Sequence, residues 1–98
     1  MSGNGRVVKV MIFGQEYPIR ARVEDDEYVR TIARYVDAKM REIDESMKPS
    51  SSMKVAILTA LNLADELFTL QEEQNRLIAE YQEKVREYTE ALDRSLKE

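Results

Sequence analysis

The stretch that decides the fold is residues 52–98, SMKVAILTALNLADELFTLQEEQNRLIAEYQEKVREYTEALDRSLKE. It contains neither Pro nor Gly, and Ser51 or Ser52 can cap its start, so it predicts one helix of about 45 residues, roughly 70 Å long. Apolar residues cover much of the circumference of its first part. From Leu77 onward they narrow to a 3-4 spacing, which is typical of a coiled-coil seam. Since no small core can cover a helix of that length, we expect a partner helix to bury the seam.

The seam identifies the residues that are expected to contact the partner helix. Gln74 interrupts the apolar series, and a buried amide at such a position selects the register of a coiled coil at some cost in stability. The predicted coiled-coil contacts are Leu70, Gln74, Leu77, Ile78, Tyr81, Val85, Tyr88 and Leu92.

Two strands are predicted near the N-terminus. Residues 7–13, VVKVMIF, are rich in β-branched side chains, and residues 16–23, EYPIRARV, alternate apolar with polar positions. Gly14 and Gln15 lie between them and favour a type II′ turn, because Gly tolerates the positive φ of the first central position. Residues 7–23 are therefore expected to form a hairpin. Pro18 cannot donate a ladder hydrogen bond, which places its side of the strand at an edge or a bulge.

A medium helix is predicted at about residues 26–47. The acidic residues 24–27 offer N-cap candidates and carboxylates that suit the positive end of a helix dipole. Pro49 and the serines after it end the helix. Its apolar stripe comprises Val29, Ile32, Ala33, Val36, Met40, Ile43 and Met47.

These elements predict an α+β, mostly helical fold: an N-terminal β-hairpin, one medium helix, and one long C-terminal helix that forms an intermolecular coiled coil. We expect a disordered tail at residues 1–5, a small head at residues 6–70 and a coiled-coil extension at residues 71–98. The head contains the hairpin, the medium helix and the start of the long helix, from about residue 52.

Composition and charge exclude several classes of function. The 98 residues contain no Cys and no His, so thiolate metal sites, cysteine nucleophiles and the commonest general base are absent. The remaining carboxylates lie mostly in adjacent pairs whose side chains diverge on a helix. We therefore expect no catalytic, cofactor-binding or metal-ligating residues. No apolar run is long enough to span a bilayer, and no secretory leader is recognisable, so we expect an unsecreted protein without membrane contact.

Nucleic-acid binding is also disfavoured. The net charge is −4, and residues 1–48 hold nine basic residues against nine acidic ones. Binding to phosphates normally requires clustered Lys and Arg without opposing acids.

Three segments resemble the ZapA family of cell-division proteins: residues 12–17, IFGQEY; residues 37–43, DAKMREI; and residues 58–67, LTALNLADEL. Their order and the long C-terminal helix extend the similarity over nearly the whole chain after the tail. The resemblance implies a head that pairs as a homodimer and coiled coils that join dimers into an antiparallel homotetramer.

The resemblance also implies a function without chemistry. It implies a cytoplasmic protein at mid-cell, where the division septum forms during the cell cycle, that binds FtsZ filaments, promotes their bundling and stabilises the Z-ring.

Residue roles follow from matching the family's segments. The residues expected at the dimer interface are Ile57, Leu61, Asn62, Leu63, Ala64 and Leu67. FtsZ surfaces are expected to be acidic, so the expected FtsZ-binding residues are basic: Arg20, Arg22, Arg30, Arg34, Lys39 and Arg41.

Two other classes of function compete with this interpretation. One is a generic cytoplasmic coiled-coil adaptor whose head binds an unrelated protein. The other is a regulatory DNA-binding protein with a dimerising coil, which the balanced charge of the head disfavours.

Overall fold

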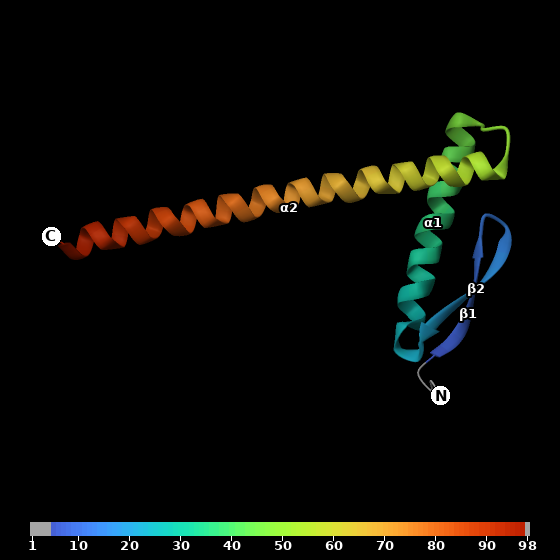
Figure 1. The fold of residues 1–98 in the computed structure, drawn as a ribbon, viewed down its shortest axis with the longest axis horizontal. Coiled ribbons are helices and arrows are strands. Elements are labelled where there is room, and N and C mark those ends of the chain that lie inside the picture. Colours follow the sequence, from blue (N-terminus) through green and yellow to red (C-terminus); the bar gives the residue numbers. More distant parts are fainter. Residues whose placement is uncertain (1–4, 98) are drawn as a thin grey trace. The chain divides into compact units, whose positions relative to one another are not determined.

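The elements follow one another in the predicted order. The computed structural model describes residues 5–97: strands β1 (Gly5–Ile12) and β2 (Gln15–Arg22), a 3-10 turn η1 (Val23–Asp25), and helices α1 (Asp26–Met47) and α2 (Ser52–Lys97) (Figure 1). The predicted fold class is confirmed. Residues 1–4 of the predicted tail lie outside the described residues, and Gly5 begins β1. The chain divides into a first unit that ends at Leu61 and a second unit that begins at Asn62, so α2 belongs to both.

The turn of the hairpin differs from the prediction. Its central residues are Phe13 and Gly14, with φ values of 51° and 81°, so it is a type I′ turn rather than a type II′ turn at Gly14 and Gln15. Both strands therefore lie one residue earlier than predicted at the turn. Gly14 adopts the left-handed region freely, whereas the same conformation costs Phe13 roughly 1 kcal/mol.

A carboxylate on α1 stabilises the unusual backbone of Phe13. The Phe13 N–H donates to Asp37 Oδ1 at 2.6 Å, and Arg41 Nε donates to Asp37 Oδ2 at 3.0 Å. The hydrogen bond from Arg41, followed by that from Phe13, lowers the pKa of Asp37 below its usual value. Asp37 thus attaches the hairpin tip to the middle of α1.

The strands pair residue for residue from Gly5↔Arg22 to Ile12↔Gln15, without a bulge. The pair that closes a two-residue turn is hydrogen-bonded, and hydrogen-bonded pairs then alternate along antiparallel strands. Pro18, opposite Lys9, consequently occupies a non-hydrogen-bonded position at the outer edge of β2. The structure confirms the edge alternative of the prediction for Pro18.

Helix α1 packs on one face of the hairpin, mainly against β1. Val8, Val10 and Ala33 form the buried core there, with exposed fractions of 2%, 5% and 6%. Ile12, Ala21 and Val29 pack against this core. The rest of the predicted stripe on α1 is half-buried, except for Ile32 and Met47, which are exposed.

The ends of α1 are fixed by contacts that the sequence only partly predicts. The N-cap residue, Asp25, makes no side-chain capping bond, so the predicted carboxylate cap is wrong at this position. Instead the next carboxylate, of Asp26, accepts two hydrogen bonds from the Arg6 guanidinium. At the other end Lys48 has a left-handed φ of 48°, and its N–H donates to Asp44 O at 3.1 Å. Pro49 follows, as predicted.

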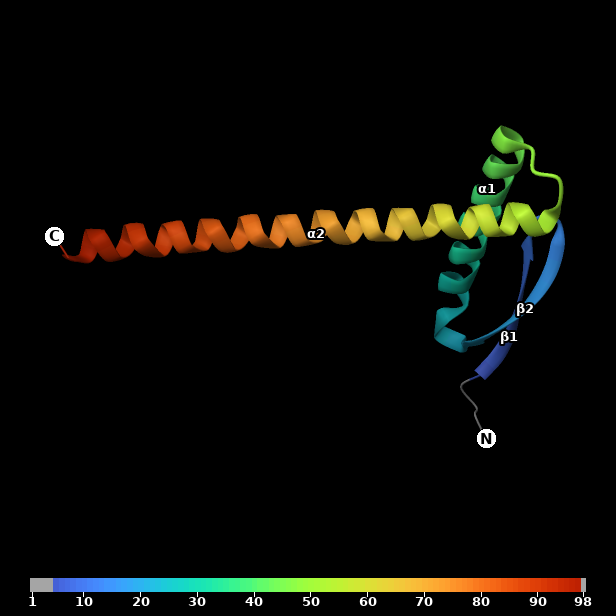
Figure 2. The same cartoon turned by 45° about the horizontal axis from the view of Figure 1, so that its top comes forward.

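Helix α2 begins with a serine cap, as predicted. The Lys54 N–H donates to Ser51 Oγ at 3.2 Å, and the Val55 N–H donates to Ser51 O at 3.1 Å. The first turns of α2 cross α1 within the first unit (Figures 1 and 2). Val55 and Thr59 are buried there, with exposed fractions of 1% and 3%. Thr59 Oγ1 is buried without a hydrogen-bond partner among the described residues.

Replacing Asp37 should weaken the attachment of the hairpin. We expect Asp37→Ala to lower the free energy of unfolding by about 2 kcal/mol, because the Phe13 N–H and the Arg41 guanidinium both lose a charged acceptor. Asp37→Asn keeps an acceptor without the charge and should cost about half as much. Chemical denaturation at neutral pH measures both. Equal stability of the wild type and Asp37→Ala would contradict the role of this contact.

The same contact predicts a dependence on pH. A carboxyl whose folded-state pKa is lowered contributes its full stabilisation above its unfolded-state pKa, about 4, and loses it as the pH falls through the folded-state value. The stabilities of the wild type and Asp37→Asn should therefore converge below about pH 4. A constant difference from pH 7 to pH 3 would contradict the assignment.

Replacing Thr59 should stabilise the protein. Thr59→Val keeps the shape of the side chain and removes a buried hydroxyl without a partner, so we expect the free energy of unfolding to rise by about 1 kcal/mol. Thr59→Ser, which keeps the hydroxyl, is the control and should not be stabilised. A loss of stability in Thr59→Val would show that the hydroxyl has a partner in solution.

Candidate interaction surfaces

The predicted coiled-coil residues all lie exposed on α2. Leu77 is 58% exposed, Val85 is 48% exposed and Tyr88 is 68% exposed. Salt bridges occupy other positions of the same stretch, joining Arg86 to Glu83 and Glu90, and Lys97 to Asp93. The second unit consists of α2 alone, so it offers no other element to bury these side chains. The exposed seam comprises Leu70, Gln74, Leu77, Ile78, Tyr81, Val85, Tyr88 and Leu92.

The residues predicted for the dimer interface divide into two groups by exposure. Ile57, Leu61 and Leu67 are exposed by more than half. Asn62, Leu63 and Ala64 are half-buried. The exposed group is directly available for contact with a second chain.

The six basic residues predicted to bind FtsZ lie on two elements. Arg20 and Arg22 are on β2, and cross-strand partners share a face, so Arg20 lies on the same face as Val7. That face is opposite to Val8 and Val10, which contact α1. The other four, Arg30, Arg34, Lys39 and Arg41, lie on α1.

The basic residues of α1 differ in how strongly they are held. Arg41 donates to Asp37, and Lys39 lies 3.9 Å from Glu42 and 5.6 Å from the centre of the Tyr35 ring. Both therefore have structural partners on α1.

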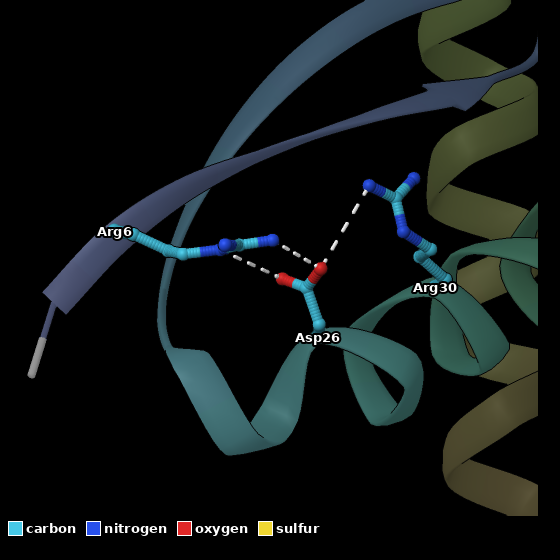
Figure 3. Close-up of polar contacts among 3 residues, drawn as sticks. All are labelled: Arg6, Asp26 and Arg30. Carbon is cyan, nitrogen blue, oxygen red and sulfur yellow. Dashed lines mark hydrogen bonds and ion pairs between the residues drawn. The ribbon is translucent and has the colours of Figure 1, made fainter.

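Arg34 and Arg30 are more exposed than Lys39, with side-chain exposed fractions of 65% and 46% against 18%. Arg34 donates to Glu27 Oε2 at 3.3 Å and to Thr31 Oγ1 at 3.2 Å, and the Glu27 side chain is also largely exposed. The guanidinium of Arg30 lies 4.0 Å from Asp26, whose carboxylate is already bonded by Arg6 (Figure 3). These two guanidinium groups are consequently the ones on α1 most available to an acidic partner.

Among the hollows of the first unit, two that border the hairpin are relevant to binding, and neither was predicted. The larger, of about 560 Å³, is mainly apolar and lies between the hairpin tip, α1 and the first turns of α2; its lining includes Phe13, Tyr17, Pro18, Met40, Met53 and Ala56. The smaller, of about 230 Å³, runs beside β1 and is lined by Lys9, Val10, Met11, Arg30, Ala33 and Arg34. Lys9 was missed because a lone Lys in a strand carries no signal until the packing of α1 on the hairpin forms a hollow at this edge of β1.

Among residues 5–97 no group of three or more acidic side chains is placed to hold a metal ion. None of the helices in that range has a stretch apolar and long enough to cross a membrane. The fold and these surfaces define a class of protein: a small α+β unit followed by a long helix with an exposed seam at coiled-coil spacing.

Sequence comparison gives the family. The family model described as "Cell division protein ZapA" matches residues 8–96, which is nearly the whole chain. The chain therefore belongs to the ZapA family of cell division proteins, and the resemblance seen in its sequence is confirmed.

Individual relatives agree with this assignment. The cell division protein ZapA of Geobacillus kaustophilus (strain HTA426) is 43% identical over 70 residues, which cover 71% of this chain and 76% of that protein. A solved structure described as an unknown conserved bacterial protein from Pseudomonas aeruginosa PAO1 has a TM-score of 0.73 and 32% identity, covering 91% of this chain and 98% of that one. A ZapA mutant dimer from Geobacillus stearothermophilus has a TM-score of 0.63 and 35% identity, covering 84% and 95%.

Proposed function

We propose that this protein binds FtsZ filaments and bundles them as a self-associated dimer or tetramer, which stabilises the Z-ring at the division septum. The observation that carries the proposal is an apolar seam left exposed on α2 in a chain that belongs to the ZapA family. The family match favours FtsZ over the unrelated partner of a generic adaptor. The protein acts in the cytoplasm at mid-cell, by binding and without catalysis.

Self-association follows from the cost of leaving the seam in water. Each fully buried Leu or Val side chain contributes roughly 2 kcal/mol, and the seam offers several such side chains at the spacing that two supercoiled helices need. The similarity to a ZapA mutant dimer supports association between copies. In this proposal residues 6–70 form the head and residues 71–98 form the coiled coil.

The proposed assembly uses two interfaces, one for the dimer and one for the tetramer. The dimer contact uses Ile57, Leu61 and Leu67, whose side chains are exposed, together with the half-buried segment 62–64. The tetramer contact uses the seam from Leu70 to Leu92. The amide of Gln74 sets the register of the tetramer contact.

The filament contact uses basic side chains of the hairpin and α1. Its candidate residues are Arg20, Arg22, Arg30, Arg34, Lys39 and Arg41, of which Arg30 and Arg34 are most available. Individual charge contacts at an exposed surface are weak. An oligomer that presents several such surfaces gains avidity, because after the first contact the others bind at a high effective concentration.

A charge in the seam should disrupt assembly. We expect Val85→Asp to shift the protein toward smaller species in sedimentation equilibrium across a concentration series, because a carboxylate cannot be buried in the seam without a partner. Ala79→Asp is the matched control, since Ala79 lies beside charged side chains, including Glu83 and Lys84. Equal association of the wild type and Val85→Asp would show that the seam is not an interface.

Shortening the chain should separate binding from bundling. We expect a chain that ends at Gln74 to form a dimer that still co-pellets with GTP-assembled FtsZ but bundles the filaments less, as measured by light scattering. The loss follows because crosslinking needs binding surfaces at both ends of a tetramer. Undiminished bundling by the shortened dimer would defeat the crosslinking mechanism, and absence of co-pelleting by the full chain would defeat the proposed partner.

A further inference from the structure

Strand β1 has an open backbone edge. Hydrogen-bonded pairs alternate from the Ile12↔Gln15 pair that closes the turn, so Val8 and Val10 bond across to β2. Val7, Lys9 and Met11 occupy the non-hydrogen-bonded positions. Their N–H and C=O groups therefore point away from β2, and the hairpin is the entire sheet of the described chain.

The corresponding edge of β2 is interrupted. Pro18 lies opposite Lys9 at the middle of β2, and its ring occupies the place of an outward N–H donor. Proline on an edge strand prevents the addition of another strand. A third strand can consequently add along β1 but not along the full length of β2.

The open edge of β1 borders the smaller hollow, where cations gather. Lys9 and Met11 line this hollow from β1, and Arg30 and Arg34 line it from α1. The Arg6 guanidinium donates two hydrogen bonds to the Asp26 carboxylate, and the Arg30 guanidinium lies 4.0 Å from the same carboxylate (Figure 3).

The charges at this surface do not cancel. On the α1 side of β1, three cations, Arg6, Arg30 and Arg34, lie with the two carboxylates of Asp26 and Glu27, and Lys9 adds a cation on the opposite face of the strand. The next carboxylate along α1, of Asp37, is held by Phe13 and Arg41. The surplus of one positive charge on this side, together with Lys9 across the strand, favours an acidic ligand.

On the other face of β1, Lys9 lies between two apolar side chains, Val7 and Met11. Val7 is 51% exposed and Met11 is 60% exposed, and both lie on the face opposite to Val8 and Val10. A strand that adds to β1 therefore meets cations on its α1 side, and on its outer side it meets Val7 and Met11 with Lys9 between them.

We infer that the open edge of β1 binds an extended protein segment that alternates acidic and apolar residues and adds to the hairpin as a third strand. Main-chain hydrogen bonds to Val7, Lys9 and Met11 supply affinity, as in other β-augmentation complexes, and the alternate side chains supply specificity. The inference deepens the proposed function, and rests on it in so far as the segment belongs to the filament protein. A second copy is a poorer occupant, because a two-fold axis through this edge places the same cations opposite one another.

The test uses a capped synthetic peptide of about seven alternating valine and glutamate residues, long enough to cover the edge. Amide hydrogen exchange of the full chain, read by NMR, reports the contact directly. We expect exchange at Lys9 and Met11 to slow by at least about tenfold with the peptide, while the amides of Val8 and Val10, already bonded to β2, change little. A peptide of alternating valine and lysine is the control and should give no protection.

Variants separate the backbone contact from the charges. Lys9→Pro removes the edge donor at the position opposite Pro18 and should abolish binding of the peptide. Lys9→Ala keeps that donor and should weaken binding only several-fold, since a single exposed charge is lost. Arg30→Ala with Arg34→Ala should weaken binding more than Lys9→Ala. If circular dichroism shows that Lys9→Pro is unfolded, an N-methylated form of the peptide, which lacks donors on one edge, replaces it and should not bind.

Three results would overturn the inference. The first is that the acidic peptide does not protect Lys9 and Met11 from exchange. The second is that the peptide still binds after both Lys9→Pro and N-methylation. The third is protection without peptide that rises with protein concentration, which would assign the edge to a second copy. Co-pelleting of the same samples with FtsZ keeps the proposals distinct. If FtsZ co-pellets and the peptide gives no protection, only the edge site fails; if the peptide protects the edge and FtsZ does not co-pellet, only the filament partner fails.

Discussion

A helix cannot bury its own narrow seam, and most features of this protein follow from that constraint. In α2 the apolar side chains from Leu77 onward lie on a stripe that a single chain leaves exposed. The stripe is too narrow for a globular core, and too regular in its 3-4 spacing to be scattered surface residues. In the proposed assembly the stability of this part of α2 depends on the concentration of other chains, because burial of the seam and association are the same event.

The first unit also has little apolar surface buried within a single chain, because its core is small. Its core contains few fully buried side chains, Val8 and Val55 being the largest, and a two-stranded hairpin is marginal in water without further packing. Polar contacts between distant segments compensate. Asp37 joins the hairpin tip to the middle of α1, and Asp26 joins the start of β1 to the start of α1 through Arg6. Each of the two carboxylates satisfies groups from both elements, so the hairpin is fixed to α1 at both ends.

The sequence predicted what depends on local chemistry and periodicity. Helix α1 has the expected limits because Pro49 stops it, and the start of α2 was predicted to within a residue because Ser51 caps it. The turn was placed one residue late because its conformation is decided by Asp37, 24 residues from Phe13. No local pattern could indicate that an aromatic residue would adopt a positive φ there. The smaller hollow beside β1 was not predicted for the same reason, since Lys9 and Arg30 come to line one hollow only through the packing of α1 on the hairpin.

The two kinds of surface suit different strengths of binding. In the proposed assembly a partner helix covers the apolar side chains of the seam, and burial of apolar surface does not depend on paired charges that salt would screen. The basic surfaces of the hairpin and α1 are exposed and partly neutralised by Asp26 and Glu27, so each contact is weak and screened by salt. In the proposed function, the contact between copies is therefore the stronger one and the contact with the filament is the weaker one. In that proposal the oligomer sets how many weak contacts act together, and the strength of binding follows from their number rather than from any single contact.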